Sequence, residues 1–264
     1  MSNHTLITFT RRSLQAATML GLLAASSHAA IITWEAPHNI TGSADVSTTG
    51  TLIGAVNLGS AGVASTTVNT VLFQALPILA RPNPPGGFDD VVTLGDFTLT
   101  ASTSSGFLQV ANGFYGSASS PFNTLPSDYQ NLLSSAANIE QPNTFTLTMN
   151  NLNIGYSYQF EWWANLSGPL GQLHSATATN TVSLNDNVSN LEGGLGQYGI
   201  GTFTANAGSQ TVTFSAVGPA NGAIANGFQL RQTAVPEPGT GLLLGIGSCF
   251  SGLFLRSRRS AARK

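Results

Sequence analysis

Alternating apolar and polar positions dominate the middle of the chain. Residues 144–149 alternate phenylalanine, leucine and methionine with threonine, and residues 211–216 repeat the pattern with valine, phenylalanine and alanine. Between them, residues 156–166 place Tyr158, Phe160 and Trp162 on one face. Strands with one apolar and one polar face are typical of antiparallel sheets that share a core. The pattern predicts an all-β fold, a two-sheet antiparallel sandwich of jelly-roll-like type.

One segment departs from this alternation. Ser127 and Gln130 have the spacing of a capping box, and Tyr129, Leu132, Leu133 and Ala136 then recur at helical spacing. We expect one short amphipathic helix here, with Ser127 as its N-cap. It is expected to close one end of the sandwich.

The end of the chain has a different composition. A 17-residue apolar run, residues 239–255, is followed by Arg256, Arg258, Arg259 and two further basic residues. As a helix the run would reach about 25 Å, slightly less than the hydrocarbon core of a bilayer. Basic residues stay on the cytoplasmic side, so the sequence predicts a single transmembrane helix with everything before Val235 outside.

The same tail resembles the PEP-CTERM sorting signal of exopolysaccharide-producing bacteria. The resemblance rests on Pro236, Glu237 and Pro238, then the short glycine-rich span, then Arg256, Arg258 and Arg259, in that order. It implies that an exosortase, a membrane-embedded transpeptidase, recognises residues 235–264 and processes them near the Pro-Glu-Pro triplet. Because each proline removes an N–H and restricts φ, the triplet is also suited to an accessible, non-helical peptide.

The start of the chain predicts export. Arg11 and Arg12 precede an apolar stretch from Leu14 to Ala25, and a small-x-small cleavage site ends at Ala29. These are the three regions of a secretory signal peptide, residues 1–29. The arginine pair also has some likeness to a twin-arginine signal, but Gln15 occupies a position where an apolar residue is expected, which favours standard secretion.

A single exported domain, residues 31–234, remains between the two ends. It contains two Lys or Arg residues against ten Asp or Glu, a formal charge of −8, which excludes a basic surface for nucleic acid. The one cysteine of the chain, Cys249, lies in the apolar run, so the domain has no disulfide.

Signatures of catalysis and of metal binding are poor. The domain has no nucleophile elbow, no thiol and no phosphate-binding loop. His38 and His174 stand in unrelated contexts, and Asp186 between two asparagines lacks a complete calcium-loop pattern. We therefore expect no enzyme, no metal and no cofactor. Two well-placed carboxylates suffice for a glycosidase, however, so a polysaccharide-acting hydrolase remains an alternative.

Trp163 is the candidate for ligand binding. On the alternating pattern it shares the polar face with Gln159, Glu161 and Asn165, as in sandwiches that bind a pyranose by stacking and polar contacts. The alternative is that a helix or loop covers this face, because tryptophan is usually mostly buried. Tyr198 and Tyr115 are weaker candidates.

These observations together predict an exported protein of the cell envelope or extracellular matrix. The precursor would be anchored in the inner membrane and then moved to the cell surface or matrix, with a structural or carbohydrate-associating role. The expected partners are the exosortase, the membrane and extracellular polysaccharide. A permanently anchored adhesin is the other alternative, and retention of the tail would distinguish it.

Overall fold

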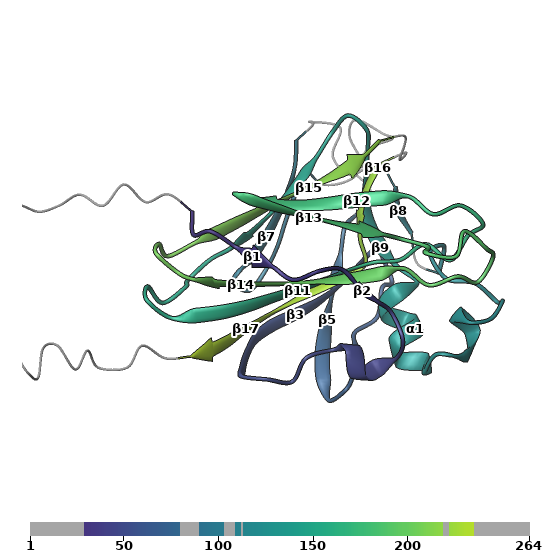
Figure 1. The fold of residues 1–264 in the computed structure, drawn as a ribbon, viewed down its shortest axis with the longest axis horizontal. Helices are drawn as coiled ribbons and strands as arrows, with labels where there is room; N and C mark the ends of the chain where they lie inside the picture. Colours follow the sequence, from purple (N-terminus) through teal and green to yellow (C-terminus); the bar gives the residue numbers. More distant parts are fainter. Residues whose placement is uncertain (1–28, 80–89, 103–108, 112, 219–221, 235–264) are drawn as a thin grey trace, which may run out of the picture.

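The computed structural model describes residues 29–79, 90–102, 109–111, 113–218 and 222–234 (Figure 1). The Pro-Glu-Pro triplet, the apolar run, the arginine cluster and the predicted signal peptide, except for its last residue, lie outside these residues. None of the helices within them is long and apolar enough to cross a membrane.

Two large sheets and one small sheet contain the strands. The largest has the order β1-β14-β11-β17-β3-β5-β4, and β2 also pairs with β14. Its strands are β1 (Thr33–Trp34), β2 (His38–Asn39), β3 (Thr51–Gly59), β4 (Thr66–Val68), β5 (Val71–Pro77), β11 (Ser157–Ala164), β14 (Gln197–Thr204) and β17 (Gly227–Ala234).

The second sheet has six strands in the order β13-β12-β15-β10-β7-β6, and the third has the order β16-β9-β8. The second contains β6 (Val91–Leu94), β7 (Phe97–Ala101), β10 (Phe145–Met149), β12 (Leu173–Ala178), β13 (Asn180–Asn185) and β15 (Gln210–Val217). The third contains β8 (Gln109–Ala111), β9 (Ala136–Glu140) and β16 (Gly222–Ala225).

Aromatic side chains join the inner faces of the two large sheets. Trp162 on β11 meets Phe214 on β15 edge-on at 5.0 Å between ring centroids. Phe97 on β7 meets Phe228 on β17 in the same way at 5.2 Å. Both contacts cross from one sheet to the other, and all four residues are at most 4% exposed. The main hydrophobic core therefore lies between these sheets.

The prediction of a mostly β fold with antiparallel sheets and one short helix is confirmed. The alternation also placed Tyr158, Phe160 and Trp162 correctly, since each is at most 1% exposed. Two features differ from the prediction: the small third sheet, and a parallel pairing of β3 with β5. The jelly-roll-like strand order stays a prediction.

The helix begins as predicted but is capped differently. α1 (Ser127–Leu133) has Pro126, not Ser127, at its N-cap position and no side-chain cap. The Gln130 side chain instead donates to the carbonyl of Leu125 at 2.6 Å. Tyr129, Leu132 and Leu133 are buried, but they pack with Trp163 in a second cluster, outside the core between the sheets. Two 3-10 helices, η1 (Ser43–Asp45) and η2 (Phe122–Thr124), complete the fold.

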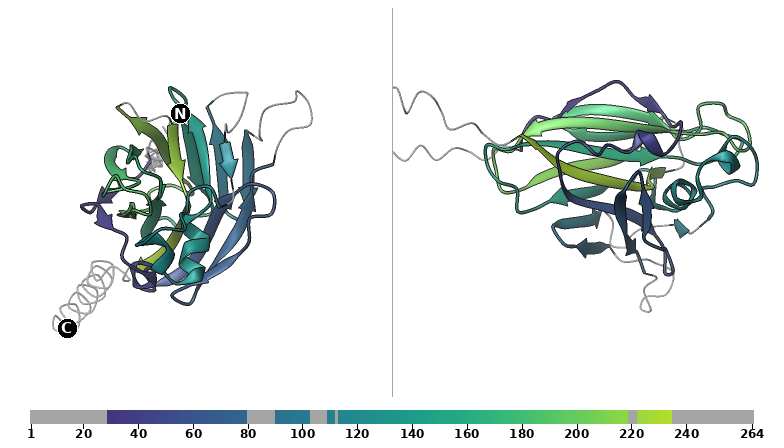
Figure 2. Two further views of the ribbon diagram at one scale, coloured as in Figure 1. Left: turned by 90° about the vertical axis from the view of Figure 1, so that its right-hand side faces the viewer. Right: turned by 90° about the horizontal axis from the view of Figure 1, so that it is seen from below.

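The two ends of the described domain lie together. In β-sheet register, Thr33 pairs with Thr202, while Ser157 pairs with both Thr204 and Ala234. β1 therefore begins and β17 ends at the same end of the molecule, opposite α1 (Figures 1 and 2). We call this end the base.

Candidate functional site

A loop crosses the outer face of the eight-stranded sheet. We call residues 35–50, which include β2 and η1, the strap. Ser47 anchors it in the middle: its N–H donates to Glu161 Oε2 at 3.2 Å, and its carbonyl accepts from Gln229 Nε2 at 3.1 Å. The strap thus covers part of the polar face that carries the predicted ligand site.

Glu161 is enclosed beneath the strap. Its side chain is 1% exposed, and Oε2 also accepts a hydrogen bond from Gln229 Nε2. Oε1 finds no hydrogen-bond partner among the described residues. Burial raises the pKa of this carboxyl group to about 7, against the lowering effects of Gln229, Ser47 and Arg231. A substantial fraction of Glu161 is therefore protonated at neutral pH.

Arg231 fastens the end of the strap. Its guanidinium donates to the carbonyls of Thr48, Thr49 and Gly50 at 2.9–3.0 Å, and to Gln229 Oε1 at 3.3 Å. The residue is 6% exposed, and its burial lowers the pKa of the guanidinium, while Glu161 raises it. Arginine still remains charged in proteins, so the carbonyl oxygens serve as its partners here.

A hydrogen-bonded chain links the strap, the helix and β11. The Trp163 indole N–H donates to the Tyr129 hydroxyl at 3.0 Å, and this hydroxyl donates to Asp45 Oδ2 at 3.1 Å. Asp45 also accepts hydrogen bonds from the N–H and the hydroxyl of Thr41 and from the N–H of Gly42, and these bonds shape η1. Burial, with Asp45 adding to it, raises the pKa of Tyr129 well above its usual value. The hydroxyl is therefore held as a proton donor.

An aromatic ledge forms where the strap meets β14. The Tyr198 ring stacks on His38 at 5.1 Å and on Trp163 at 6.2 Å. His38 is the outer ring, partly exposed, and its Nε2 lies 3.0 Å from Glu35 Oε2. Burial, with the charges of Asp45, Glu161 and Glu35 adding to it, raises the pKa of Tyr198 to about 12. The Tyr198 O–H thus stays a donor at neutral pH.

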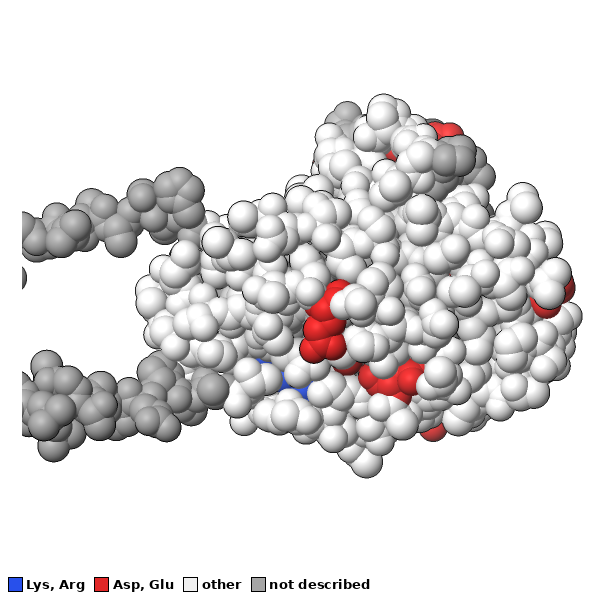
Figure 3. Space-filling model, viewed as in Figure 1, with Lys and Arg blue, Asp and Glu red and all other residues white. Residues whose placement is uncertain are grey.

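Charge on this side of the molecule is mostly acidic. Figure 3 shows acidic atoms gathered in the middle of the face, over β2, β11 and η1, with basic atoms beside them. Arg231 is the single Lys or Arg among the described residues. The ledge therefore lies in a negative field that disfavours anionic ligands.

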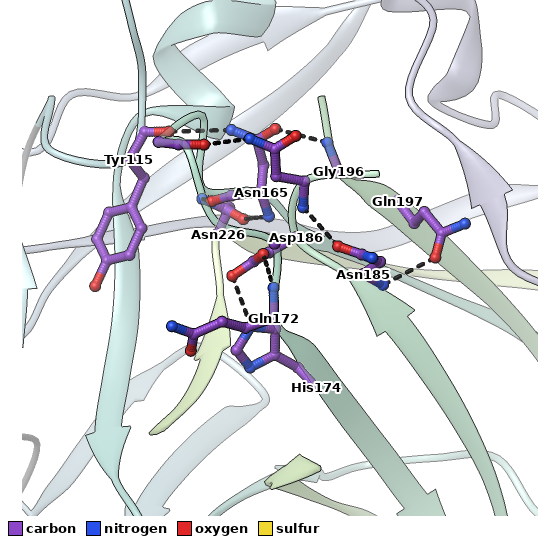
Figure 4. A network of polar contacts seen from close by, with 12 residues as sticks. Tyr115, Asn165, Gln172, His174, Asn185, Asp186, Gly196, Gln197 and Asn226 are labelled. Atoms are coloured by element: carbon purple, nitrogen blue, oxygen red, sulfur yellow. Dashed lines mark hydrogen bonds and ion pairs between the residues drawn. The ribbon is translucent and has the colours of Figure 1, made fainter. Parts of the chain in front are cut away.

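A second polar cluster lies inside the end of the molecule that carries α1 (Figure 4). Asn165 and Asn226 are both fully buried. Asn165 Nδ2 donates to the carbonyl of Tyr115 and its Oδ1 accepts from the Gly196 N–H. Asn226 Nδ2 donates to the carbonyls of Leu133 and Ser135. These amides satisfy loop backbone groups that would otherwise be buried without partners, which is a structural task.

A histidine–aspartate pair belongs to the same cluster. His174 Nε2 lies 2.8 Å from Asp186 Oδ2, and both side chains are at most 2% exposed. Asp186 Oδ1 accepts from the Gln172 N–H at 2.6 Å. His174 Nδ1 has no hydrogen-bond partner among the described residues. Without exposure, the pair has no access to a substrate in this conformation.

The four residues predicted for ligand binding do not form one exposed surface. Trp163 and Asn165 are fully buried and Glu161 is 1% exposed, whereas Gln159 is half-buried. The expectation of an exposed indole at Trp163 is wrong, because α1 and the strap cover this face. Trp163 is instead covered by a helix and a loop, which was the alternative for this face. Asn165 moreover belongs to the amide cluster and not to the strap.

The sequence patterns did not identify several residues of these clusters. Arg231 and Gln229 were not among the predicted site residues, and nothing in the sequence indicated that the strap would cover them. The pairing of His174 with Asp186 joins β12 to the loop after β13, which residue spacing does not reveal. Within the described residues, no group of three or more His, Cys, Asp or Glu side chains is arranged to hold a metal ion.

The described residues define a mostly antiparallel β protein with one short α-helix. The chain carries a PEP-CTERM protein-sorting motif, matched by a family model at residues 234–259. The resemblance of the tail is thus confirmed, and the motif begins at the last residue of β17. No curated protein matches the chain.

Some solved structures show a distant likeness. A Bacteroides uniformis β-glucuronidase is similar over 68% of this chain and 18% of its own length, at 14% identity and a TM-score of 0.39. A carbohydrate-binding module of the β-sandwich superfamily is similar over 70% of this chain and 95% of its own, at 13% identity and a TM-score of 0.15. The chain spans less than a fifth of the length of the glucuronidase. Similarities this low assign no activity.

Proposed function

We propose that this chain is an exported protein of the cell envelope or extracellular matrix, delivered through its PEP-CTERM tail. The signal peptide, residues 1–29, directs export, and residues 239–255 hold the precursor in the inner membrane. An exosortase-type transpeptidase then processes the tail near Pro236, Glu237 and Pro238. The observation that carries the proposal is the sorting motif at residues 234–259, which begins where β17 ends.

For the domain itself, residues 31–234, we propose a structural or carbohydrate-associating role and no enzymatic one. The groups with the strongest chemistry, Glu161, His174 and Asp186, are each at most 1% exposed and are engaged in holding loops. A neutral saccharide fits the aromatic ledge better than an anionic one does, because Glu35 and Asp45 lie close to Tyr198. The partly exposed His38 ring offers one apolar contact. The side-chain amides of Asn39 and Gln197, which are joined by a hydrogen bond of 2.9 Å, offer several polar ones.

Processing of the tail tests the proposed sorting. Replacing Pro236, Glu237 and Pro238 by alanine should leave unprocessed precursor in the membrane of a host that has the cognate transpeptidase. Cys249→Ala changes the same tail without touching the triplet and should be processed normally. Mass spectrometry of the mature protein gives the answer: a wild-type C-terminus still at Lys264 would contradict the proposal and favour a permanently anchored adhesin.

Binding at the aromatic ledge tests the carbohydrate association. His38→Ala should abolish retention of the domain in gels that contain the host's neutral exopolysaccharide, with an unchanged melting temperature. The wild-type dissociation constant should lie between about micromolar and millimolar, since few contacts are available. Tyr156→Ala, a half-buried tyrosine at the base, is the matched control and should retain binding. Equal retention of His38→Ala and wild type would show that the ledge does not bind the polysaccharide.

A further inference from the structure

Two large apolar side chains protrude at the base of the domain. Ile31 is 61% exposed and Ile154 is 66% exposed. Isolated exposed apolar residues are ordinary on a protein surface, so their exposure alone indicates nothing. Their position relative to the tail is the informative feature.

Both isoleucines flank the strand end from which the tail departs. Ile31 lies two residues before Thr33, which pairs with Thr202, so the antiparallel register carries Ile31 toward Thr204. Ile154 lies three residues before Ser157, which pairs with both Thr204 and Ala234. The next residue, Gly155, donates its N–H to the carbonyl of Ala205 at 2.7 Å, which keeps this loop at the base.

The covalent geometry of the chain limits how far the base lies from a membrane. β17 ends at Ala234, and the apolar run starts at Gly239. Five residue steps span at most about 18 Å even when fully extended. If residues 239–255 span the bilayer, the base must therefore stay within reach of the lipid headgroups.

The surface beside Ile31 suits that position. A shallow hollow of about 260 Å³ is lined by Ile31, Tyr158 and Phe203 and by the hydroxyl residues Thr33, Ser157, Thr202, Thr204 and Thr233. Figure 3 shows neither acidic nor basic atoms at this end on the face in view. The carboxylate that borders the Ile154 loop, Asp96, accepts a hydrogen bond from Asn151 at 2.6 Å. On the face in view, the base of a domain of formal charge −8 therefore shows no exposed charge.

We propose that the base is a membrane-contact surface, in which Ile31 and Ile154 enter the interface of the bilayer that holds the tail. The inference rests on the proposed anchoring of the precursor. It fixes the orientation of the domain: the end with α1 and the buried amide cluster points away from the membrane. Two side chains orient a tethered domain but do not retain a released one, because stable attachment requires more than one weak anchor. Removal of the tail would therefore free the domain.

A labelled full-length chain tests this orientation. In a Cys249→Ala background, Ile154→Cys and, as the matched control, Leu191→Cys each carry an environment-sensitive fluorophore. Leu191 is also 66% exposed but lies in the loop that follows β13, at the far end. The chains are reconstituted into vesicles of phosphatidylethanolamine and phosphatidylglycerol that contain a spin-labelled quencher at the top of the acyl chains. Flotation of the vesicles is measured first, and quenching afterwards.

We expect both chains to float with the vesicles. The label at residue 154 should be quenched at least about twofold more strongly than the label at residue 191, because interfacial side chains enter about 5–10 Å into the headgroup region. Flotation with equal quenching at both positions would overturn the orientation and leave the anchoring intact. Failure to float would overturn both. A blue-shifted but unquenched label at residue 154 would make the base a contact between copies of the chain, which also overturns the proposal.

Discussion

Trp163→Ala is expected to destabilise the exported domain by about 3–5 kcal/mol, as for other large-to-small changes of buried aromatic residues. The indole is fully buried in the cluster formed by α1 and the outer face of the eight-stranded sheet. Its removal leaves a cavity against Phe73, whose ring meets the indole edge-on at 5.5 Å. It also leaves the Tyr129 hydroxyl without the donor that connects it to β11.

Urea unfolding of residues 30–234 measures this effect. The fragment starts at Ala30 because this residue is only 5% exposed and belongs to the core. Trp163→Phe is the graded control: it keeps an aromatic ring but loses the indole N–H, and should cost about 1–2 kcal/mol. A Trp163→Ala variant with unchanged stability and abolished polysaccharide binding would restore an exposed role for this tryptophan and contradict the structure.

The strand that carries Trp163 shows what the sequence could and could not predict. Alternation along residues 156–166 identified the strand and its core face, because that face is determined by the β period alone. For the other face, the sequence left two interpretations, an exposed ligand site or a face covered by a helix or loop, and the structure has the cover. Its cover comes from Ser47, 114 positions before Glu161, and from Tyr129, 34 positions before Trp163. Residue spacing within one strand contains no information about such partners.

In the helix and the tail, too, local properties were predictable from the sequence and non-local ones were not. The stripe of Tyr129, Leu132 and Leu133 predicted a buried helical face, which is a local property. The sheet face that receives this stripe is a non-local property, so the packing of α1 on Trp163, outside the core between the sheets, was not predicted. The sorting motif was fully predictable, since its three parts follow one another within residues 234–259. The buried amides Asn165 and Asn226 were not predictable as a pair, because 61 residues separate them.

Glu161→Gln is expected to change the pH dependence of stability. Burial raises the pKa of Glu161 from 4.5 to about 7 in the folded domain, so the folded state binds its proton more tightly than the unfolded chain does. The protonated group stabilises the fold at low pH, and this contribution is lost as pH rises from about 4.5 through about 7. At about 1.4 kcal/mol per pKa unit, the loss amounts to roughly 3 kcal/mol.

Glutamine imitates the protonated carboxyl group at every pH. The variant should therefore equal wild type near pH 4.5 and exceed its free energy of unfolding by up to about 3 kcal/mol at pH 8. Glu140→Gln, at an exposed position, should stay within about 0.5 kcal/mol of wild type throughout. Denaturant unfolding of all three proteins between pH 4.5 and 8 provides the comparison. The same slope in wild type and Glu161→Gln would mean that Glu161 is already ionised beneath the strap, with Arg231 compensating for its burial.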